Sequence, residues 1–111
     1  MNQCIFCKII DKESPSKVVY EDKDVIAFHD ISPLAPIHIL IVAKEHINSL
    51  ADIKDGKIVG IMGEIAAKIA KDLNIVNEGF RVVTNCGDNG GQTVNHLHFH
   101  LLAGRAMGSM G

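Results

Sequence analysis

The sequence predicts a single α+β domain, built from a five-stranded, mainly antiparallel sheet with one long and one short helix. Two observations indicate this fold class. Apolar residues recur with a helical period between residues 56 and 73, and five shorter runs are rich in β-branched and apolar residues. The length of 111 residues suits one modest core, so residues 1–111 are treated as one domain.

The first half of the chain predicts a short helix and then three strands. Residues 4–10, CIFCKII, can place their apolar side chains on one side of a helix. Residues 17–22 and 25–30 are β-rich runs around a turn, as in a hairpin. Two prolines exclude regular structure from residues 31–36. The nearly continuous apolar run at residues 37–44 is typical of a strand buried on both faces.

The second half predicts the long helix and two further strands. Gly60 and Gly63 each weaken this helix by roughly 1 kcal/mol relative to Ala, so we expect another helix or a sheet to approach them closely. Residues 80–87 and 96–104 are the expected strands, and a glycine-rich loop at 88–93 separates them. The apolar residues that recur at helical spacing are Ile58, Ile61, Met62, Ile65, Ile69 and Leu73.

Composition narrows the classes of function. The formal net charge of −2 argues against a general nucleic-acid binder, which needs a basic surface. No apolar run is long enough to predict a membrane span. The N-terminus lacks a signal-peptide pattern, so we expect a cytoplasmic protein.

The chain has three cysteines, and an odd number argues against a disulfide framework. The spacing of Cys4 and Cys7 indicates half of a metal site, because no strand precedes them as in a thioredoxin-like motif. Cys86 stands alone and is expected to be a small buried hydrophobe.

Three of the six histidines lie at every second position of the predicted strand at 96–104. Alternation puts His96, His98 and His100 on one face, opposite Leu97, Phe99 and Leu101. Residues two apart on a strand are roughly 6.5–7 Å apart at Cα, so neighbouring imidazoles can act on one ligand. Three interpretations are open: a solvated strand face, an H-x-H site of a metal-dependent hydrolase, or a nucleophilic histidine with helper groups.

The surrounding residues favour the nucleophile. No Asp or Glu lies between residue 89 and the C-terminus, where a metal-dependent hydrolase would recruit further ligands. Glycines in the segment GDNGGQT, residues 87–93, let backbone N–H groups bind an anion, and Asn85 and Thr93 add donors. Imidazole attack suits phosphorus, so phosphoryl chemistry is the expected reaction class.

These residues resemble a known family. The segment GGQTVNHLHFHLLAGR, residues 90–105, is similar to the signature of the histidine triad (HIT) superfamily, in which three histidines alternate with apolar residues. Residues 27–47 and 5–22 also resemble that family, specifically its nucleotide-binding (HINT-like) branch. The resemblance implies the HIT-like fold and a hydrolase that binds purine nucleoside monophosphates such as AMP and GMP and cleaves the P–N bond of nucleoside 5′-phosphoramidates.

The resemblance implies roles for four histidines. His98 is the nucleophile, attacks the α-phosphorus and carries the nucleotidyl group until water releases it. His100 contacts the phosphate, and His38 orients the nucleophile. His96 belongs to the catalytic set unless it binds a metal.

A nucleotide-binding set follows from the same resemblance. Asp30 accepts a hydrogen bond from the ribose. The phosphate is bound by His100 together with Asn85, Gly91, Gln92 and Thr93. The apolar slot for the base consists of Ile5, Phe6, Ile9, Phe28 and Ile31.

The resemblance also bears on metal and partners. Some relatives hold a structural zinc at the places occupied here by Cys4, Cys7, His46 and His96, and such a Cys₂His₂ set suits tetrahedral Zn²⁺. No cofactor is implied for catalysis. A homodimer is implied, with the long helix and a sheet edge at its interface.

Two alternative functions stay open. A dinucleoside polyphosphate hydrolase would share the nucleophile and release another leaving group, and a nucleotide-binding or sensor module would retain only vestigial catalysis. Thr93 stands where many relatives have serine, and the tail GRAMGSMG has no tryptophan, unlike that of some relatives.

Overall fold

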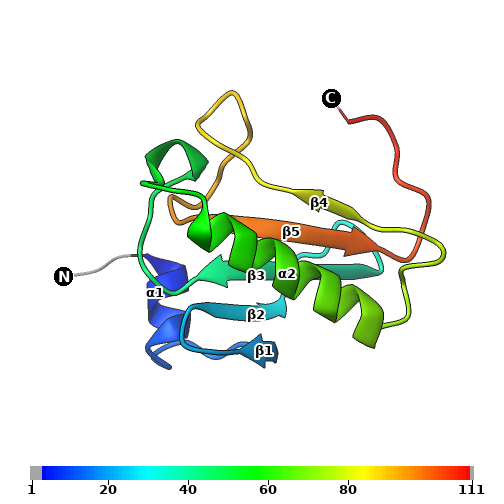
Figure 1. Cartoon of the computed structure of the whole chain (residues 1–111), viewed down its shortest axis with the longest axis horizontal. Coiled ribbons are helices and arrows are strands. Elements are labelled where there is room, and N and C mark those ends of the chain that lie inside the picture. Colours follow the sequence, from blue (N-terminus) through cyan, green and yellow to red (C-terminus); the bar gives the residue numbers. More distant parts are fainter. Residues whose placement is uncertain (1–3, 111) are drawn as a thin grey trace.

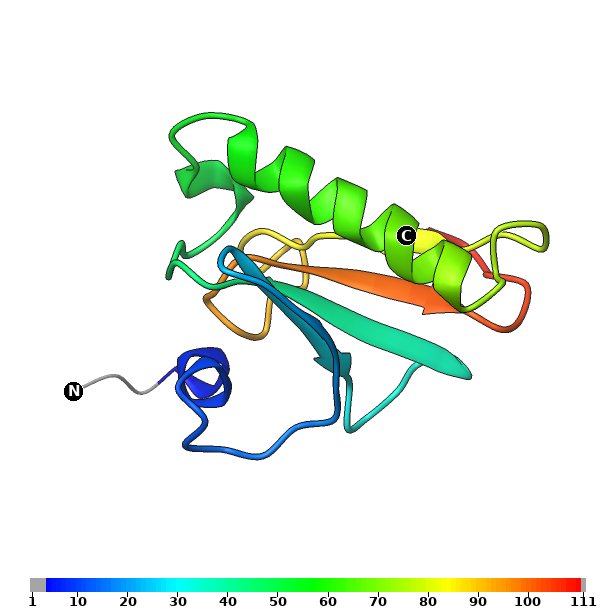
Figure 2. The same ribbon diagram turned by 60° about the horizontal axis from the view of Figure 1, so that its bottom comes forward.

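One five-stranded antiparallel sheet, in the order β1-β2-β3-β5-β4, lies between two helices (Figure 1). The computed structural model describes residues 4–110, and the predicted single domain of residues 1–111 extends beyond them at both ends. The long helix covers one face of the sheet and the short helix lies at the other (Figure 2). The elements are α1 (Ile5–Ile10), β1 (Val18–Glu21), β2 (Val25–His29), β3 (Ile37–Ala43), a 3₁₀ turn (Leu50–Asp52), α2 (Lys57–Asp72), β4 (Arg81–Val83) and β5 (His98–Ala103).

The predicted α+β class is confirmed, with five strands, one long helix and one short helix. The expected hairpin is β1 paired with β2, and residues 31–36 form no regular element. The strand expected to be buried on both faces is β3, which forms the antiparallel partner of both β2 and β5. The sequence did not predict the short 3₁₀ turn.

All five strands are shorter than expected, and side-chain and loop contacts explain the limits of β4 and β5. β5 begins at His98 rather than at residue 96, because the Leu97 N–H donates to the Ile47 oxygen in a loop, at 2.6 Å, instead of to a strand. β4 ends at Val83, and at the next residue the Thr84 hydroxyl, not a main-chain N–H, donates to the His98 carbonyl at 2.8 Å. His96 therefore precedes the strand and does not lie on it.

The two faces of the sheet carry different side chains. The face toward α2 is an apolar core to which β3 contributes Ile39 and Ile41 and β5 contributes Phe99 and Leu101. The face toward α1 has a smaller apolar cluster, which includes Phe6 of α1 and Leu40 of β3. His98 and His100 alternate with the core residues of β5 and therefore lie on the α1 side.

The glycines of α2 are exposed, and the expected close approach is absent within the described chain. A Cβ built at Gly60 or at Gly63 would meet nothing within 4 Å among the residues that the structure describes. Residues 4–110 also contain no helix that is both long enough and apolar enough to span a bilayer.

Candidate active site

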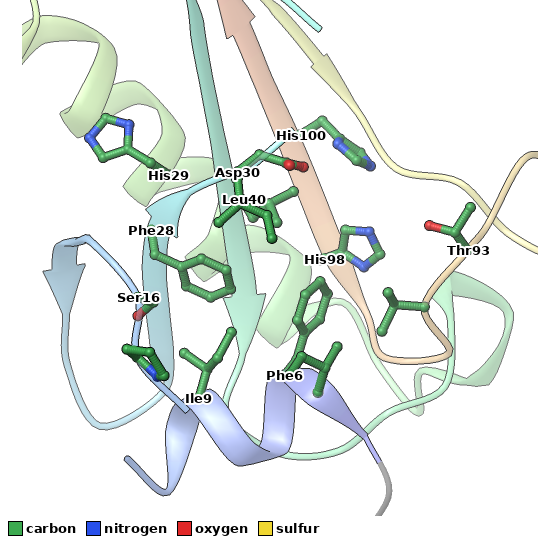
Figure 3. A pocket seen from close by; sticks show the side chains of 14 residues that line it. Phe6, Ile9, Ser16, Phe28, His29, Asp30, Leu40, Thr93, His98 and His100 are labelled. Atoms are coloured by element: carbon green, nitrogen blue, oxygen red, sulfur yellow. The ribbon is translucent and has the colours of Figure 1, made fainter. Parts of the chain in front are cut away.

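A pocket of about 270 Å³ lies between α1 and the histidine-bearing face of the sheet (Figure 3). His98, His100 and Thr93 lie at one end of it, and Ser16 and His29 lie at the other. A small apolar cavity with a few polar groups at one end is typical of a small-molecule site. Its lining consists of Ile5, Phe6, Ile9, Pro15, Ser16, Phe28, His29, Asp30, Ile31, Leu40, Thr93, Val94, His98 and His100.

The His98 ring is buried and held in one tautomer. Its Nδ1 lies 2.6 Å from the main-chain oxygen of His96. A carbonyl only accepts, so Nδ1 carries the hydrogen and Nε2 of the neutral ring keeps its lone pair. Burial lowers the pKa of His98, although the bond to His96 and the charge of Asp30 oppose this. The Phe6 ring meets His98 edge-on, with centroids 4.9 Å apart.

His38 and His100 form a second fixed pair. The Leu34 N–H donates to His38 Nδ1 at 3.1 Å, so the hydrogen of the neutral His38 ring is on Nε2. His38 Nε2 lies 2.9 Å from His100 Nδ1, which must therefore accept, and His100 carries its own hydrogen on Nε2. The resemblance implied that His38 orients the nucleophile, whereas its ring partner in the structure is His100.

Burial disfavours the charged form of both rings of this pair. Burial lowers the pKa of His38, and the nearby Asp30 carboxylate opposes the effect. Burial is also the main cause that lowers the pKa of His100 to about 4, and the charges of His98 and His38 lower it further. One oxygen of Asp30 lies 3.5 Å from His38 Nε2 and the other accepts from Ser32 N–H at 2.8 Å. A neutral His100 offers an N–H donor at the end of the pocket.

The glycine-rich loop beside the pocket is tied by two amide side chains. Asn85 Nδ2 donates to the Gly90 oxygen at 2.7 Å, and Gln92 accepts from the Gly87 N–H at 2.9 Å. Gln92 also donates to the main chain at Asn48, at 2.7 Å. Gly91 has φ of +84°, a conformation that favours glycine. Asn85 and Gln92 therefore hold the loop in shape.

The pocket unites most of the predicted substrate-binding residues. The five apolar residues, Asp30, Thr93, His98 and His100 all line it, whereas Asn85, Gly91 and Gln92 do not. Sequence reasoning missed five lining residues: Pro15, Ser16, His29, Leu40 and Val94. Leu40 could have been predicted from the sequence, because it lies two positions after His38 on the same strand and therefore shares its face.

A second group of side chains lies next to His98, on the side of Phe6 and His96. Ligand atoms of Cys4, Cys7, His46 and His96 all lie within 4.8 Å of one another. His96 Nδ1 is 3.3 Å from Cys4 Sγ and 3.5 Å from Cys7 Sγ, and His46 Nδ1 is 3.2 Å from Cys7 Sγ. We call this group the Cys/His cluster.

The donor set of the Cys/His cluster fits a tetrahedral metal. Zn–S bonds of about 2.3 Å and Zn–N bonds of about 2.0 Å place ligand atoms about 3.3–3.8 Å apart, which is close to the observed spacing. His96 Nε2 donates to the Ala43 oxygen at 2.6 Å, and His46 Nε2 lies 2.9 Å from Asn48 Oδ1. Both rings therefore direct an Nδ1 lone pair at the sulfurs.

Cys86 lies outside this cluster. The sequence suggested a small buried hydrophobe, but Cys86 is exposed, because it belongs to the segment that leads into the surface glycine loop. Its Sγ donates to Ser49 Oγ at 3.3 Å.

Comparison with known proteins agrees with this geometry. A family model described as the HIT domain matches residues 11–107. The chain is 46% identical over 110 residues to the purine nucleoside phosphoramidase of Escherichia coli K12, covering 97% of this chain and 92% of that protein. It is 48% identical over 109 residues to an uncharacterised HIT-like protein of Buchnera aphidicola, covering 96% and 97%.

Solved structures agree as well. A histidine triad protein from Clostridium difficile is 49% identical, with a TM-score of 0.93 and all of both chains covered. A HIT family hydrolase from Clostridium thermocellum is 49% identical, with a TM-score of 0.93, covering 98% of this chain and 96% of that one. The fold and the alternating histidines define a histidine triad protein, and the chain belongs to the HIT-domain family of hydrolases. The resemblance seen in the sequence is thereby confirmed.

Proposed function

We propose that this hydrolase cleaves the P–N bond of purine nucleoside 5′-phosphoramidates through a covalent nucleotidyl-His98 intermediate. The observation that carries the proposal is the hydrogen bond from His98 Nδ1 to a carbonyl, which leaves the lone pair of the neutral ring on Nε2 in a residue that lines the pocket. The relative named purine nucleoside phosphoramidase supports an enzyme of the phosphoramidase type.

The proposed first step forms one bond and breaks another. His98 Nε2 attacks the α-phosphorus, and the bond from phosphorus to the amine nitrogen breaks. That nitrogen takes up a proton and departs as the amine. His100 Nε2–H and the Thr93 hydroxyl are the donors at this end of the pocket, available to the phosphate oxygens and the leaving group. Water then attacks phosphorus and the bond from phosphorus to His98 Nε2 breaks. The proton that water loses replaces the one taken up by the amine, and the nucleoside monophosphate leaves neutral His98 behind.

The rest of the pocket suits a nucleoside. The apolar slot between α1 and β2 brings Phe6 and Phe28 together edge-on, with centroids 5.7 Å apart, and its walls can cover the faces of a purine. Asp30 lies between this slot and the two histidines in Figure 3, where its carboxylate can accept from a ribose hydroxyl. The apolar side chains of the slot do not distinguish adenine from guanine, so we expect both AMP and GMP derivatives to bind.

The variant His98→Asn tests the nucleophile. It should abolish cleavage of adenosine and guanosine 5′-phosphoramidates and leave AMP and GMP binding within a few-fold of the parent, because Asn preserves a polar group in the same place. Rapid quenching of the parent should trap a nucleotidyl adduct on a peptide containing His98, detected by mass spectrometry. Parent-level turnover by the variant, or an adduct elsewhere, refutes the mechanism.

A substrate panel separates the alternatives. Faster cleavage of dinucleoside polyphosphates than of phosphoramidates would favour the polyphosphate hydrolase, which uses the same His98. Tight binding of AMP or GMP with negligible turnover of every substrate would favour a sensor module.

We propose further that the Cys/His cluster holds one structural Zn²⁺, supported by the four converging donors and the two oriented histidines. A metal bound there with tetrahedral coordination would link α1 rigidly to the segment before β5. Elemental analysis of protein purified without chelator should find about one zinc per chain, and a stoichiometry near zero refutes this.

A homodimer is the state we propose in solution. The β4 edge carries Val82, which is 41% exposed, and the exposed glycine face of α2 lies open to a partner. Light scattering coupled to size exclusion should give twice the chain mass, and a monomer at micromolar concentration contradicts it.

A further inference from the structure

The Cys/His cluster is joined to the pocket by two separate routes. The first route runs through α1. This helix has only six residues, which is too short to persist on its own in water. The helix contributes Cys7 to the cluster, and it contributes Phe6 and Ile9 to the lining of the pocket. Contacts that hold Cys7 in place therefore also hold one wall of the apolar slot in place.

The second route runs through the main chain of His96. This ring is fully buried and fixed at both nitrogens, by the sulfurs at Nδ1 and by the Ala43 oxygen at Nε2. The carbonyl of the same residue accepts the Nδ1 hydrogen of His98 at 2.6 Å. A shift of the His96 ring would move this acceptor, and with it the direction of the His98 lone pair.

The Phe6 ring connects the two routes. It meets the His98 ring edge-on at 4.9 Å and the His96 ring edge-on at 5.9 Å, so α1 and the nucleophile pack directly against each other. A displacement of α1 therefore reaches both the base slot and the catalytic imidazole.

We propose that metal occupancy of the Cys/His cluster sets the nucleotide affinity of the pocket and the orientation of His98, so that Cys4, Cys7 and His46 are positioning residues for the active site. This inference rests on the proposed nucleotide-binding function. Groups that orient metal ligands from outside typically change metal affinity or activity by about 10–100-fold, and we expect an effect of that order on the pocket. A groove lined by Cys4, His46 and Asn48 opens on the cluster and gives metal and chelators access to it.

The test compares zinc-loaded and zinc-free full-length protein. Zinc is removed with a chelator, the chelator is dialysed away, and Zn²⁺ is added back to half of the sample. Calorimetric titration with AMP and GMP should give a Kd about tenfold or more higher without zinc, restored by Zn²⁺. In protein labelled with ¹⁵N-histidine, the Nδ1-protonated tautomer of His98 should be seen with zinc and replaced by a tautomer mixture without it.

Variants separate positioning from loss of stability. Cys7→Ser should lose zinc and bind AMP like the zinc-free parent, whether Zn²⁺ is added or not. Cys86→Ser is the matched cysteine control, because Cys86 is exposed and outside the cluster, and it should keep the zinc content and the Kd of the parent. Met62→Ala opens a cavity in the core on the α2 face, so it should lower stability and leave the Kd unchanged.

Three results overturn the inference. These are a protein that takes up no zinc, an equal Kd and His98 tautomer with and without zinc, and a rise in Kd for Met62→Ala as large as that for Cys7→Ser. In each case the proposed function survives if His98→Asn is inactive and the parent binds nucleotide. Failure of both zinc-loaded and zinc-free protein to bind AMP or GMP refutes the proposed function as well.

Discussion

The free energy of unfolding should fall in mild acid, because His100 takes up a proton more readily in the unfolded chain than in the folded one. Burial and the neighbouring rings lower the pKa of this residue from 6.5 to about 4. Between these pH values the unfolded chain binds a proton that the folded chain excludes, so the free energy of unfolding must fall as the pH falls. Each pKa unit corresponds to about 1.4 kcal/mol, so His100 alone accounts for a loss of up to roughly 3 kcal/mol between pH 6.5 and pH 4. Below pH 4 its contribution is constant.

Urea unfolding at half-unit steps from pH 4 to pH 7.5 measures this slope. His100→Asn removes the titrating group, and its amide oxygen can still accept from His38, so the variant should lose less stability in acid than the parent by roughly 3 kcal/mol. His29→Asn is the matched control, because the His29 side chain is exposed, and it should follow the parent curve. If His100→Asn and the parent have parallel pH dependences, the burial argument for His100 is wrong.

Two further predictions concern the loop after β5 and the acidic residue of the pocket. Gly104→Ala should lower the free energy of unfolding by roughly 2–4 kcal/mol, because φ is +98° and a new Cβ would lie 2.7 Å from Pro36 Cβ. Gly108→Ala, where a Cβ meets nothing within 4 Å, should change it by less than about 0.5 kcal/mol, and equal melting of the two variants would contradict the strain argument. Asp30→Asn should move the acidic limb of the kcat–pH profile to lower pH, because the carboxylate raises the pKa of His38, His98 and His100. An unmoved limb at saturating substrate would show that Asp30 does not act on these rings.

The parts of the fold that depend on local pattern were predictable. The apolar run at residues 37–44 predicted the strand β3, and the helical spacing from Ile58 to Leu73 predicted α2. The parts that depend on distant contacts were not. The starting point of β5 is decided by Leu97, which bonds to Ile47, a residue fifty positions earlier that no local pattern connects to it.

The candidate site shows the same division. Alternation placed His98 and His100 on one face of a strand, and the order of cysteines and histidines indicated the Cys/His cluster. Sequence could not show that His38 bonds to His100 rather than to His98, because that choice depends on the register of β3 against β5. Nor could it show that Gln92 is occupied by loop contacts, since an amide of this type suits a phosphate equally well.

The strand order has a consequence for how the enzyme matures on the ribosome. β5 follows the other four strands in the chain, yet it lies between β3 and β4, and β4 has no other partner in the described sheet. Until residues 98–103 emerge, the nascent chain has an unpaired β3 edge and an isolated β4 segment. His98, the proposed nucleophile, lies on the strand that closes the sheet, so the candidate site can form only when the sheet is complete.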